Sequence, residues 1–289
     1  MLDYINKLIK LGKPTAQLFD EYLALLPNEQ RVSDKIIEIY QKESRNITIN
    51  SLAFKNLEDN KTLFFPKLGG YVYVLIIGAI DNSFREACKN KNEQLLQQVV
   101  DANEKLPKSP ASKQKEELYM NYYKKSNDLD KYISYATIYC DASLMTISSD
   151  SIAKTDKKAL DLFETTQRKL LIGKIDSTQL AQLSDYMSHA TRDKYSQALN
   201  EVAWEFFEKA ADTKSLEDAL RWSKRSLEIY PDNHIFIDTY ANLVYKLGRK
   251  EEAITKETEA LNITKRKKSD PTVYEATLLK MKIGEKTWK

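Results

Sequence analysis

Apolar side chains recur along the chain at intervals of three and four residues, which is the spacing of one face of an α-helix. The pattern begins at residues 2–9, and Pro14 suits the first turn of a second helix. Ser33 and Ser51 precede later stretches and are candidate N-caps. Glycine and proline, with 7 residues each, seldom interrupt the pattern. The sequence therefore predicts an all-α protein with long helices.

One apolar run, residues 71–80, fits two structures. Its β-branched residues suit a buried strand, whereas its continuation into Phe84 and Ala87 has helical spacing. A lone strand among helices would leave backbone groups without partners, so a helix is favoured. The run is half the length of about 20 residues that a membrane span needs. Residues 1–10 lack a basic segment followed by an apolar run, so neither a span nor a signal peptide is predicted.

Interruptions of the pattern divide the chain into regions. Two prolines in residues 106–110 indicate a linker. After it, two tyrosine-rich helices flank a turn at residues 126–128 and form a weak, degenerate repeat. We expect a helix to continue through residues 90–100 and a polar break at residues 148–155. The predicted regions are an N-terminal helical region (1–106), a helical hairpin region (111–195) and a repeat module (196–289).

The last region repeats itself when the sequence is shifted by 34 residues. Ala219 then aligns with Ala253, and Phe206 aligns with Tyr240 and Tyr274. A period of about 34 residues with apolar positions of this kind is typical of helix–turn–helix arrays, whose units bury their faces on each other. Such arrays bind other molecules, most often proteins.

These positions resemble the tetratricopeptide repeat (TPR) family over about residues 200–283. The matching segments of the two units are Asp218–Leu220, Ser226-Leu227 and Pro231, and Tyr240-Ala241, Tyr245–Gly248, Glu252–Ile254 and Ala260-Leu261. The resemblance implies stacked antiparallel helix hairpins, an α-solenoid, ending in TPR units and one capping helix. Ala219 and Ala253 would lie where two helices approach closely, and Gly248 would take a positive φ after a helix end.

The chain departs from the family pattern at several positions. Phe207 stands where the family prefers a small residue, and residues 211–214 lack the turn glycine. Lys265 replaces the proline that closes a unit. Ser215, followed by Asp218 three residues later, is expected to form the N-terminal box of a second helix.

In the TPR family, first-helix positions line a concave face that holds a partner segment. Carried over to this chain, the partner-binding candidates are Glu201, Trp204, Glu205, Glu208, Asp212, Asp238, Asn242 and Tyr245. Ile235 and Lys246 share that face. The first unit is mostly acidic and lacks the Lys, Arg and Asn residues that would hold a partner's C-terminal carboxylate. A basic or apolar partner segment is therefore expected, and the alternative is that these acids form a solvated face.

A second resemblance concerns the helical region that follows the thioredoxin domain in some exported bacterial thioredoxin-like proteins. It is carried by Asn200–Trp204, Ala219–Ser223, Asp238–Ala241 and Tyr245–Gly248. The chain has two cysteines, Cys88 and Cys140, and no Cys-X-X-Cys motif, so the redox domain itself is missing from it. Two buried thiols are expected, and a disulfide between them stays open.

Charge and motifs exclude further classes. Lys+Arg 45 against Asp+Glu 42 gives a net charge of +3, too near balance for a nucleic-acid partner. The basic cluster Lys265–Lys268 fits a helix C-terminus, where carbonyl dipoles attract cations. His189 and His234 have no ligand spacing, and no phosphate loop or nucleophile motif is present. No cofactor, metal or catalytic residue is predicted.

Three hypotheses follow. The first is a non-catalytic scaffold that binds a partner protein or peptide on the concave face. The second is an accessory helical arm of a thioredoxin-like thiol–disulfide oxidoreductase, with a thioredoxin-like domain as partner. The third is a homo-oligomer built on tyrosine-rich seams, since the chain has 17 tyrosines. A fragment of an exported thioredoxin-like protein would be periplasmic, and the chain would otherwise be cytoplasmic.

Overall fold

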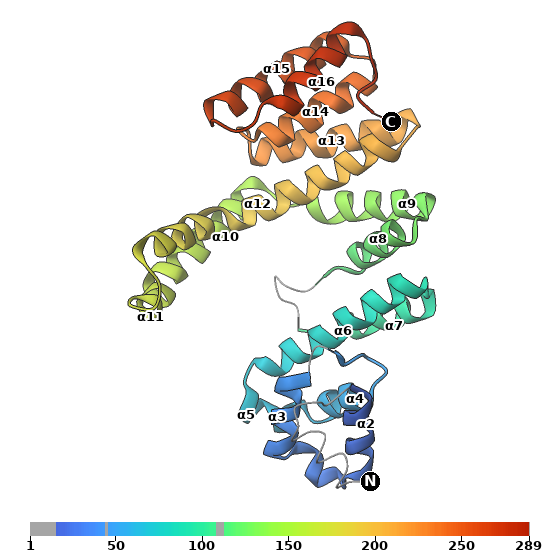
Figure 1. Ribbon diagram of the computed structural model, residues 1–289, viewed down its shortest axis with the longest axis vertical. Coiled ribbons are helices and arrows are strands. Elements are labelled where there is room, and N and C mark those ends of the chain that lie inside the picture. The colour runs from blue at the N-terminus through green and yellow to red at the C-terminus, as the bar shows by residue number, and fades with distance from the viewer. Residues whose placement is uncertain (1–15, 44–45, 108–112, 289) are drawn as a thin grey trace. The chain divides into compact units, whose positions relative to one another are not determined.

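The computed structural model describes residues 16–43, 46–107 and 113–288. Over these ranges the chain is all-α, as predicted, and they contain no strand beyond an isolated bridge between Ile172 and Ile175 (Figure 1). The helix expected at residues 2–9, with Pro14 after it, and part of the proline linker lie outside the described residues.

The chain divides into two compact units, Met1–Tyr132 and Ile133–Lys289. The helices of the first unit are α2 (Ala16–Leu25), the short 3-10 helix η1 (Asn28–Val32), α3 (Asp34–Glu43), α4 (Leu52–Asp59), α5 (Lys61–Leu68), α6 (Tyr71–Asn90), α7 (Glu93–Glu104) and α8 (Lys115–Ser126). The boundary between the units lies inside α9 (Leu129–Tyr139).

Aromatic side chains form the core of the first unit. The ring of Tyr40 packs edge-on against Phe19 and Phe64, and its hydroxyl donates to the carbonyl of Ala53 at 2.7 Å. Ser51 caps α4 by accepting the N–H of Phe54, as the sequence predicts. The ambiguous run 71–80 is helical and opens α6, which confirms the favoured alternative. Four tyrosines of α8 and α9 are buried, namely Tyr122, Tyr123, Tyr132 and Tyr139, whereas Tyr119 and Tyr135 are half-buried.

Two predictions of where helices continue or break are wrong. The helix expected through residues 90–100 is interrupted, because Lys91 takes a positive φ of 50° and Asn92 caps a new helix by accepting the N–H of Leu95. The break expected at residues 148–155 is helical, because Ser148 accepts the N–H of Ser151 and starts α10 (Ser149–Leu162). In both places a short polar side chain satisfies a backbone donor at a helix start.

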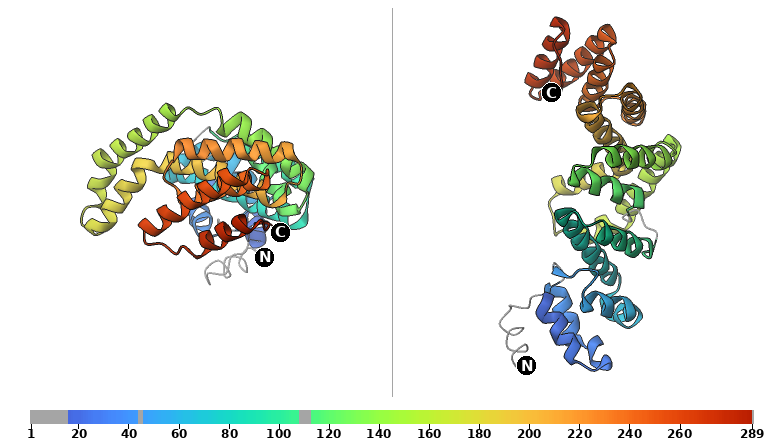
Figure 2. Two further views of the ribbon diagram at one scale, coloured as in Figure 1. Left: turned by 90° about the horizontal axis from the view of Figure 1, so that it is seen from above. Right: turned by 90° about the vertical axis from the view of Figure 1, so that its right-hand side faces the viewer.

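The second unit continues with the π-helical turn η3 (Cys140–Leu144), α10, the π-helical turn η4 (Phe163–Gln167), α11 (Arg168–Leu171), α12 (Ser177–Lys209), α13 (Thr213–Ile229), α14 (His234–Lys246), α15 (Lys250–Arg266) and α16 (Thr272–Ile283). Along α12–α16 each helix packs on the next one in the chain, and Figure 2 shows them from two sides. A single helix, α16, follows the second hairpin, as expected.

The structure buries the small residues at equivalent repeat positions and gives the turn glycine a positive φ. Ala219 and Ala253 have no exposed surface, and Gly248 has a φ of 83°. The predicted box at Ser215 is wrong: the carboxylate of Asp212 caps α13 by accepting the N–H of Ser215 at 2.8 Å. The cap lies three residues before the predicted one because the turn after α12 is short and has no glycine.

Helix α12 carries both the packing of α10 and the start of the repeat. Its first part lies alongside α10 (Figure 1), and its later part packs on α13 and α14. The region boundary predicted at residues 195–196 lies inside this helix. Helix α12, in which the sequence repeat begins, therefore also packs on α10.

None of the helices in the described residues is, taken singly, both long and apolar enough to cross a membrane; α5 and α6 meet that criterion only as a pair bent by 120°.

Candidate partner-binding face

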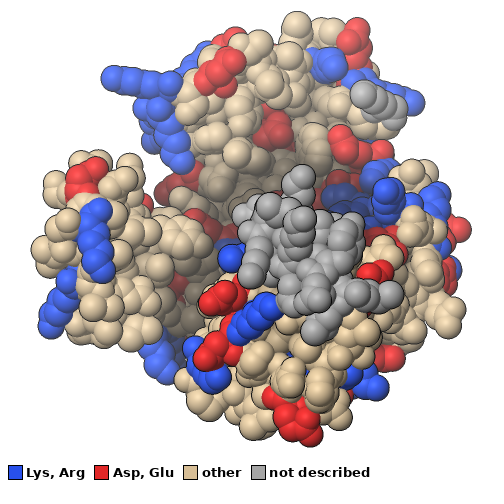
Figure 3. Space-filling view, turned by 60° about the horizontal axis from the view of Figure 1, so that its bottom comes forward, with Lys and Arg blue, Asp and Glu red and all other residues tan. Residues whose placement is uncertain are grey.

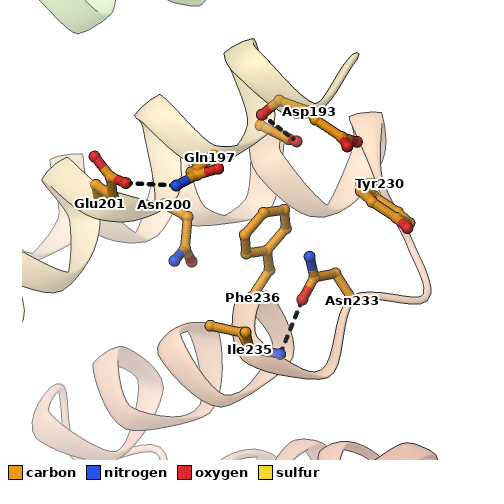
Figure 4. Close-up of a pocket in the computed structure, with 9 residues that line it drawn as sticks. Asp193, Gln197, Asn200, Glu201, Tyr230, Asn233, Ile235 and Phe236 are labelled. Carbon is orange, nitrogen blue, oxygen red and sulfur yellow. Dashed lines mark hydrogen bonds between the residues drawn. The ribbon is translucent and has the colours of Figure 1, made fainter. Parts of the chain in front are cut away.

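A pocket of about 430 Å³ lies between α12 and the start of α14 (Figure 4). Its walls come from one side of α12, from the loop after α13 and from the first turn of α14. The lining residues are Asp193, Ser196, Gln197, Asn200, Glu201, Tyr230, Asn233, Ile235 and Phe236. The side chains from α12 are all polar, whereas Ile235 and Phe236 supply an apolar wall.

Two buried oxygens of this pocket, Asp193 Oδ1 and Asn200 Oδ1, have no hydrogen-bond partner among the described residues, and Asn200 is the more buried of the two residues. Its side chain is 6% exposed, and its Oδ1 has no hydrogen-bond partner among the residues that the structure describes. In Figure 4 the amide extends from α12 toward the space beside α14. A buried acceptor left without a donor costs about 1–3 kcal/mol, so this oxygen is a ready acceptor for an N–H or O–H from a bound molecule.

Several other side chains of the pocket are already held by hydrogen bonds within the chain. Gln197 donates to the carboxylate of Glu201 at 2.8 Å, and Asn233 caps α14 by accepting the N–H of Ile235. The side chain of Ile235 is 52% exposed, so an apolar contact is available. Asp193 pairs with His189 at 2.7 Å. Burial lowers the pKa of His189, but hydrogen bonds to Asp185 and Asp193 outweigh it, and the net pKa is raised.

The predicted acidic residues of the first unit have separate roles. Glu201 lines the pocket, and Glu208 is exposed. Glu205 is half-buried and forms an ion pair with Lys209 at 2.6 Å. Asp212 caps α13, and its hydrogen bonds with Ser215 lower its pKa. The structure therefore brings one of these carboxylates into the pocket and uses another to hold the backbone.

Asp238 and Asn242, predicted on the second unit, interact with each other. The amide of Asn242 donates to the carboxylate of Asp238 at 3.0 Å, and Asn242 is 2% exposed. Asp238 also faces Glu257 of α15, which has no exposed surface. Burial raises the pKa of both carboxyl groups, and the pKa of Glu257 is raised further by the neighbouring Asp238. Two buried carboxyl groups thus face each other between α14 and α15.

Aromatic rings gather where α12 and α14 end. Trp204 packs on Phe207 with ring centroids 4.9 Å apart. Trp288, in the segment after α16, lies 6.3 Å from Phe207 and 6.2 Å from Tyr245, measured between ring centroids. Trp204 and Tyr245 were predicted from the sequence, whereas the pairing of Phe207 with Trp288 was not. Phe207 is therefore the position on which Trp288 packs.

Other titratable groups are held in structural contacts. Cys88 and Cys140 are both free thiols, and burial raises the pKa of each, which keeps them in the weakly nucleophilic thiol form. His234 hydrogen-bonds with Tyr274 at 2.7 Å. Within the described ranges no group of three His, Cys, Asp or Glu side chains is placed to hold a metal.

Surface charges are mixed. On the face drawn in Figure 3, Lys and Arg side chains alternate with Asp and Glu side chains. In the basic cluster, Lys265 pairs with Glu275 at 2.7 Å and Lys267 donates to the carbonyl of Asp232 at 3.3 Å. These contacts agree with the interpretation of the cluster as the last turn of a helix.

Sequence reasoning missed Asn200 and Trp288. Asn200 stood in the sequence as the first residue of the repeat, and only its burial without a partner distinguishes it from a surface amide. Gly284 ends α16, and a large aromatic residue, Trp288, follows it four residues later. A glycine at a helix end followed by an apolar side chain is the signal in the sequence that could have predicted a chain reversal here.

Comparison of the sequence with known protein families and with curated proteins finds no match.

Proposed function

We propose that this protein is a non-catalytic protein-binding scaffold that holds an extended partner segment on the face formed by α12 and α14. The observation that carries the proposal is the buried, unpartnered Oδ1 of Asn200 in a pocket of about 430 Å³. An extended segment presents main-chain N–H groups that are free to donate to such an acceptor.

The proposed partner segment is apolar and basic. An apolar side chain would cover Ile235, and a Lys or Arg would lie near the exposed carboxylates of Glu201 and Glu208. The proposal includes a TPR-like solenoid arrangement of α12–α16. The buried alanines at equivalent positions and the positive φ of Gly248 support it.

Selection of peptides from a random display library against the full chain tests this function. We expect selected peptides to bind the Asn200→Ala variant roughly tenfold more weakly, since a lost hydrogen bond in a buried site is worth about 1–1.5 kcal/mol. Glu201→Lys/Glu208→Lys should weaken basic peptides further and make binding less dependent on salt. Isothermal titration calorimetry measures both effects.

The matched control is Glu251→Lys, on the exposed first turn of α15 and outside the pocket. Equal affinities of wild type, Asn200→Ala and the charge reversals would show that the peptides do not bind this face. A thioredoxin-like domain offered as the ligand in the same titration tests the second hypothesis, the accessory arm of a thiol–disulfide enzyme.

A further inference from the structure

The segment that follows α16 turns back toward the ends of α12 and α14. Gly284 has a φ of 82°, and the N–H of Glu285 donates to the carbonyl of Lys280 at 2.9 Å, which is a helix-ending turn. Lys250 of α15 donates to the carbonyl of Lys282 at 2.9 Å and fixes the approach. The segment thus reaches the aromatic cluster by a defined path.

Trp288 is half-buried against two rings and two cations. Its ring meets Phe207 and Tyr245 nearly edge-on, with interplanar angles of 80° and 68°. The ammonium of Lys246 lies 5.4 Å from its ring centroid, and that of Lys286 lies 5.9 Å from it. Edge-to-face rings and cations over indole are both favourable contacts.

Trp288 packs on a cradle that we define as Phe207, Tyr245 and Lys246, and two of these three residues are held by other contacts. Lys246 donates to the carbonyls of Phe207 and Ala210, at 2.5 and 3.0 Å, which are acceptors at the end of α12. The same ammonium lies 5.4 Å from the centroid of the Phe207 ring, and Phe207 is 1% exposed. Phe207 and Lys246 are therefore held together by contacts that do not involve the indole.

The fit of the segment is incomplete. The hydroxyl of Thr287 is buried and has no hydrogen-bond partner in the part of the chain that the structure describes. A ligand that presents the same indole and leaves no unpaired hydroxyl would bind this place better than the segment does.

We propose that the cradle is a binding subsite for a partner's tryptophan side chain, and that Trp288 occupies it as an internal competitor. The inference deepens the proposed function, on which it rests, because Tyr245 and Lys246 lie on the same α14 as Ile235 of the pocket. The occupant is an extended partner segment with a lysine two residues before a tryptophan, the spacing of Lys286 and Trp288. The exposed carboxylate of Glu208, in the same turn of α12 as Phe207, favours the lysine.

Competition in the same chain has a predictable size. A short flexible connection gives an effective concentration of about 1 mM. A free ligand with a Kd of about 0.1 mM for the empty cradle would then bind roughly tenfold more weakly while Trp288 occupies it.

The test uses the full chain with Trp288→Ala and, as probe, a fluorescein-labelled peptide with the sequence of residues 283–288. Fluorescence anisotropy should show binding to Trp288→Ala about tenfold tighter than to wild type. The same peptide with alanine in place of its tryptophan should not bind. Tyr245→Ala in the Trp288→Ala background should weaken binding at least threefold, while circular dichroism confirms that both variants stay folded.

Ile283→Ala is the matched control, because this residue, the last of α16, is 60% exposed and lies outside the cradle. It should leave the affinity of the wild-type chain for the probe unchanged. Equal affinities of wild type and Trp288→Ala, or no binding to a folded Trp288→Ala chain, would overturn the inference. If library-selected peptides still bind the wild-type chain more tightly than Asn200→Ala, the proposed function holds and only the tryptophan subsite is wrong. If the binding of those peptides does not depend on Asn200 either, both proposals are wrong.

Discussion

At the scale of single residues, burial and the neighbouring Asp238 raise the pKa of Glu257 well above its usual range. It has no exposed surface, and no N–H or hydroxyl group of the described residues donates a hydrogen bond to its carboxyl oxygens. It faces Asp238 of α14, and Tyr274 of α16, which hydrogen-bonds with His234, lies close to both. Two facing carboxyl groups share a hydrogen bond only when one of them is protonated.

The sign of the resulting pH dependence follows from the raised pKa of Glu257. The folded chain keeps a proton that the unfolded chain releases above its usual pKa of about 4.3. Folding therefore takes up a proton in that range, and the stability present at low pH is lost as pH rises toward the folded-state pKa. The slope reaches about 1.4 kcal/mol per pH unit.

We expect Glu257→Gln to raise the free energy of unfolding at pH 8 by about 1–3 kcal/mol. The amide would donate to the Asp238 carboxylate without needing a proton. Urea unfolding at pH 5, 6.5 and 8, followed by circular dichroism, should show a flatter pH dependence than wild type. Glu251→Gln, an exposed change near the start of the same helix, serves as control. A pH dependence equal to that of wild type would contradict the shared proton.

At the scale of elements, Asp156 joins α10 to the middle of α12. Its carboxylate is 6% exposed and accepts the N–H groups of Thr191 and Arg192 at 2.6 and 3.2 Å. These donors lie inside a helix of 33 residues, where carbonyls one turn earlier are the usual acceptors. The bond therefore fixes α10 beside the part of α12 that leads to the pocket.

We expect Asp156→Ala to lower the free energy of unfolding by about 2–4 kcal/mol, since two backbone donors lose a charged acceptor in a buried place. Chemical unfolding measures the loss. Asp161→Ala provides the matched control, because it makes the same change on the exposed face of the same helix. A loss no larger than that of Asp161→Ala would show that α12 holds its own backbone without α10.

The sequence predicts helices better than their ends. Helical periodicity extends over many residues, so α6 could be predicted even though its first half also suits a strand. A helix cap, in contrast, is a single side chain, and several polar side chains near a helix start are candidates for it. Asp212 and Ser215 compete for the start of α13, and the length of the preceding turn decides between them. That length depends on how α12 packs on α13, which no local pattern records.

At the scale of the whole molecule, the repeat predicts that helices adjacent in sequence pack together, as α12–α16 do. It does not predict which polar groups of the face formed by α12 and α14 lack partners. Asn200 is such a group because residues of α14 and of the loop before it cover it without offering a donor. Trp288 reaches Phe207 across 81 residues of sequence, and no periodicity connects the two. Contacts of this length come only from the assembled structure.

The two compact units give the last prediction. All contacts of the pocket and of the cradle lie within Ile133–Lys289. A chain shortened to residues 128–289 keeps α9 whole and retains Asp128, whose carboxylate accepts the N–H of Lys131. We expect it to unfold in one cooperative thermal transition and to bind the library-selected peptides within about twofold of the full chain, since separate sites contribute nearly independently. Circular dichroism and calorimetry measure the two properties. A non-cooperative melt would show that the second unit needs the first to fold, and a large loss of affinity in a folded chain would show that the first unit contributes to the binding face.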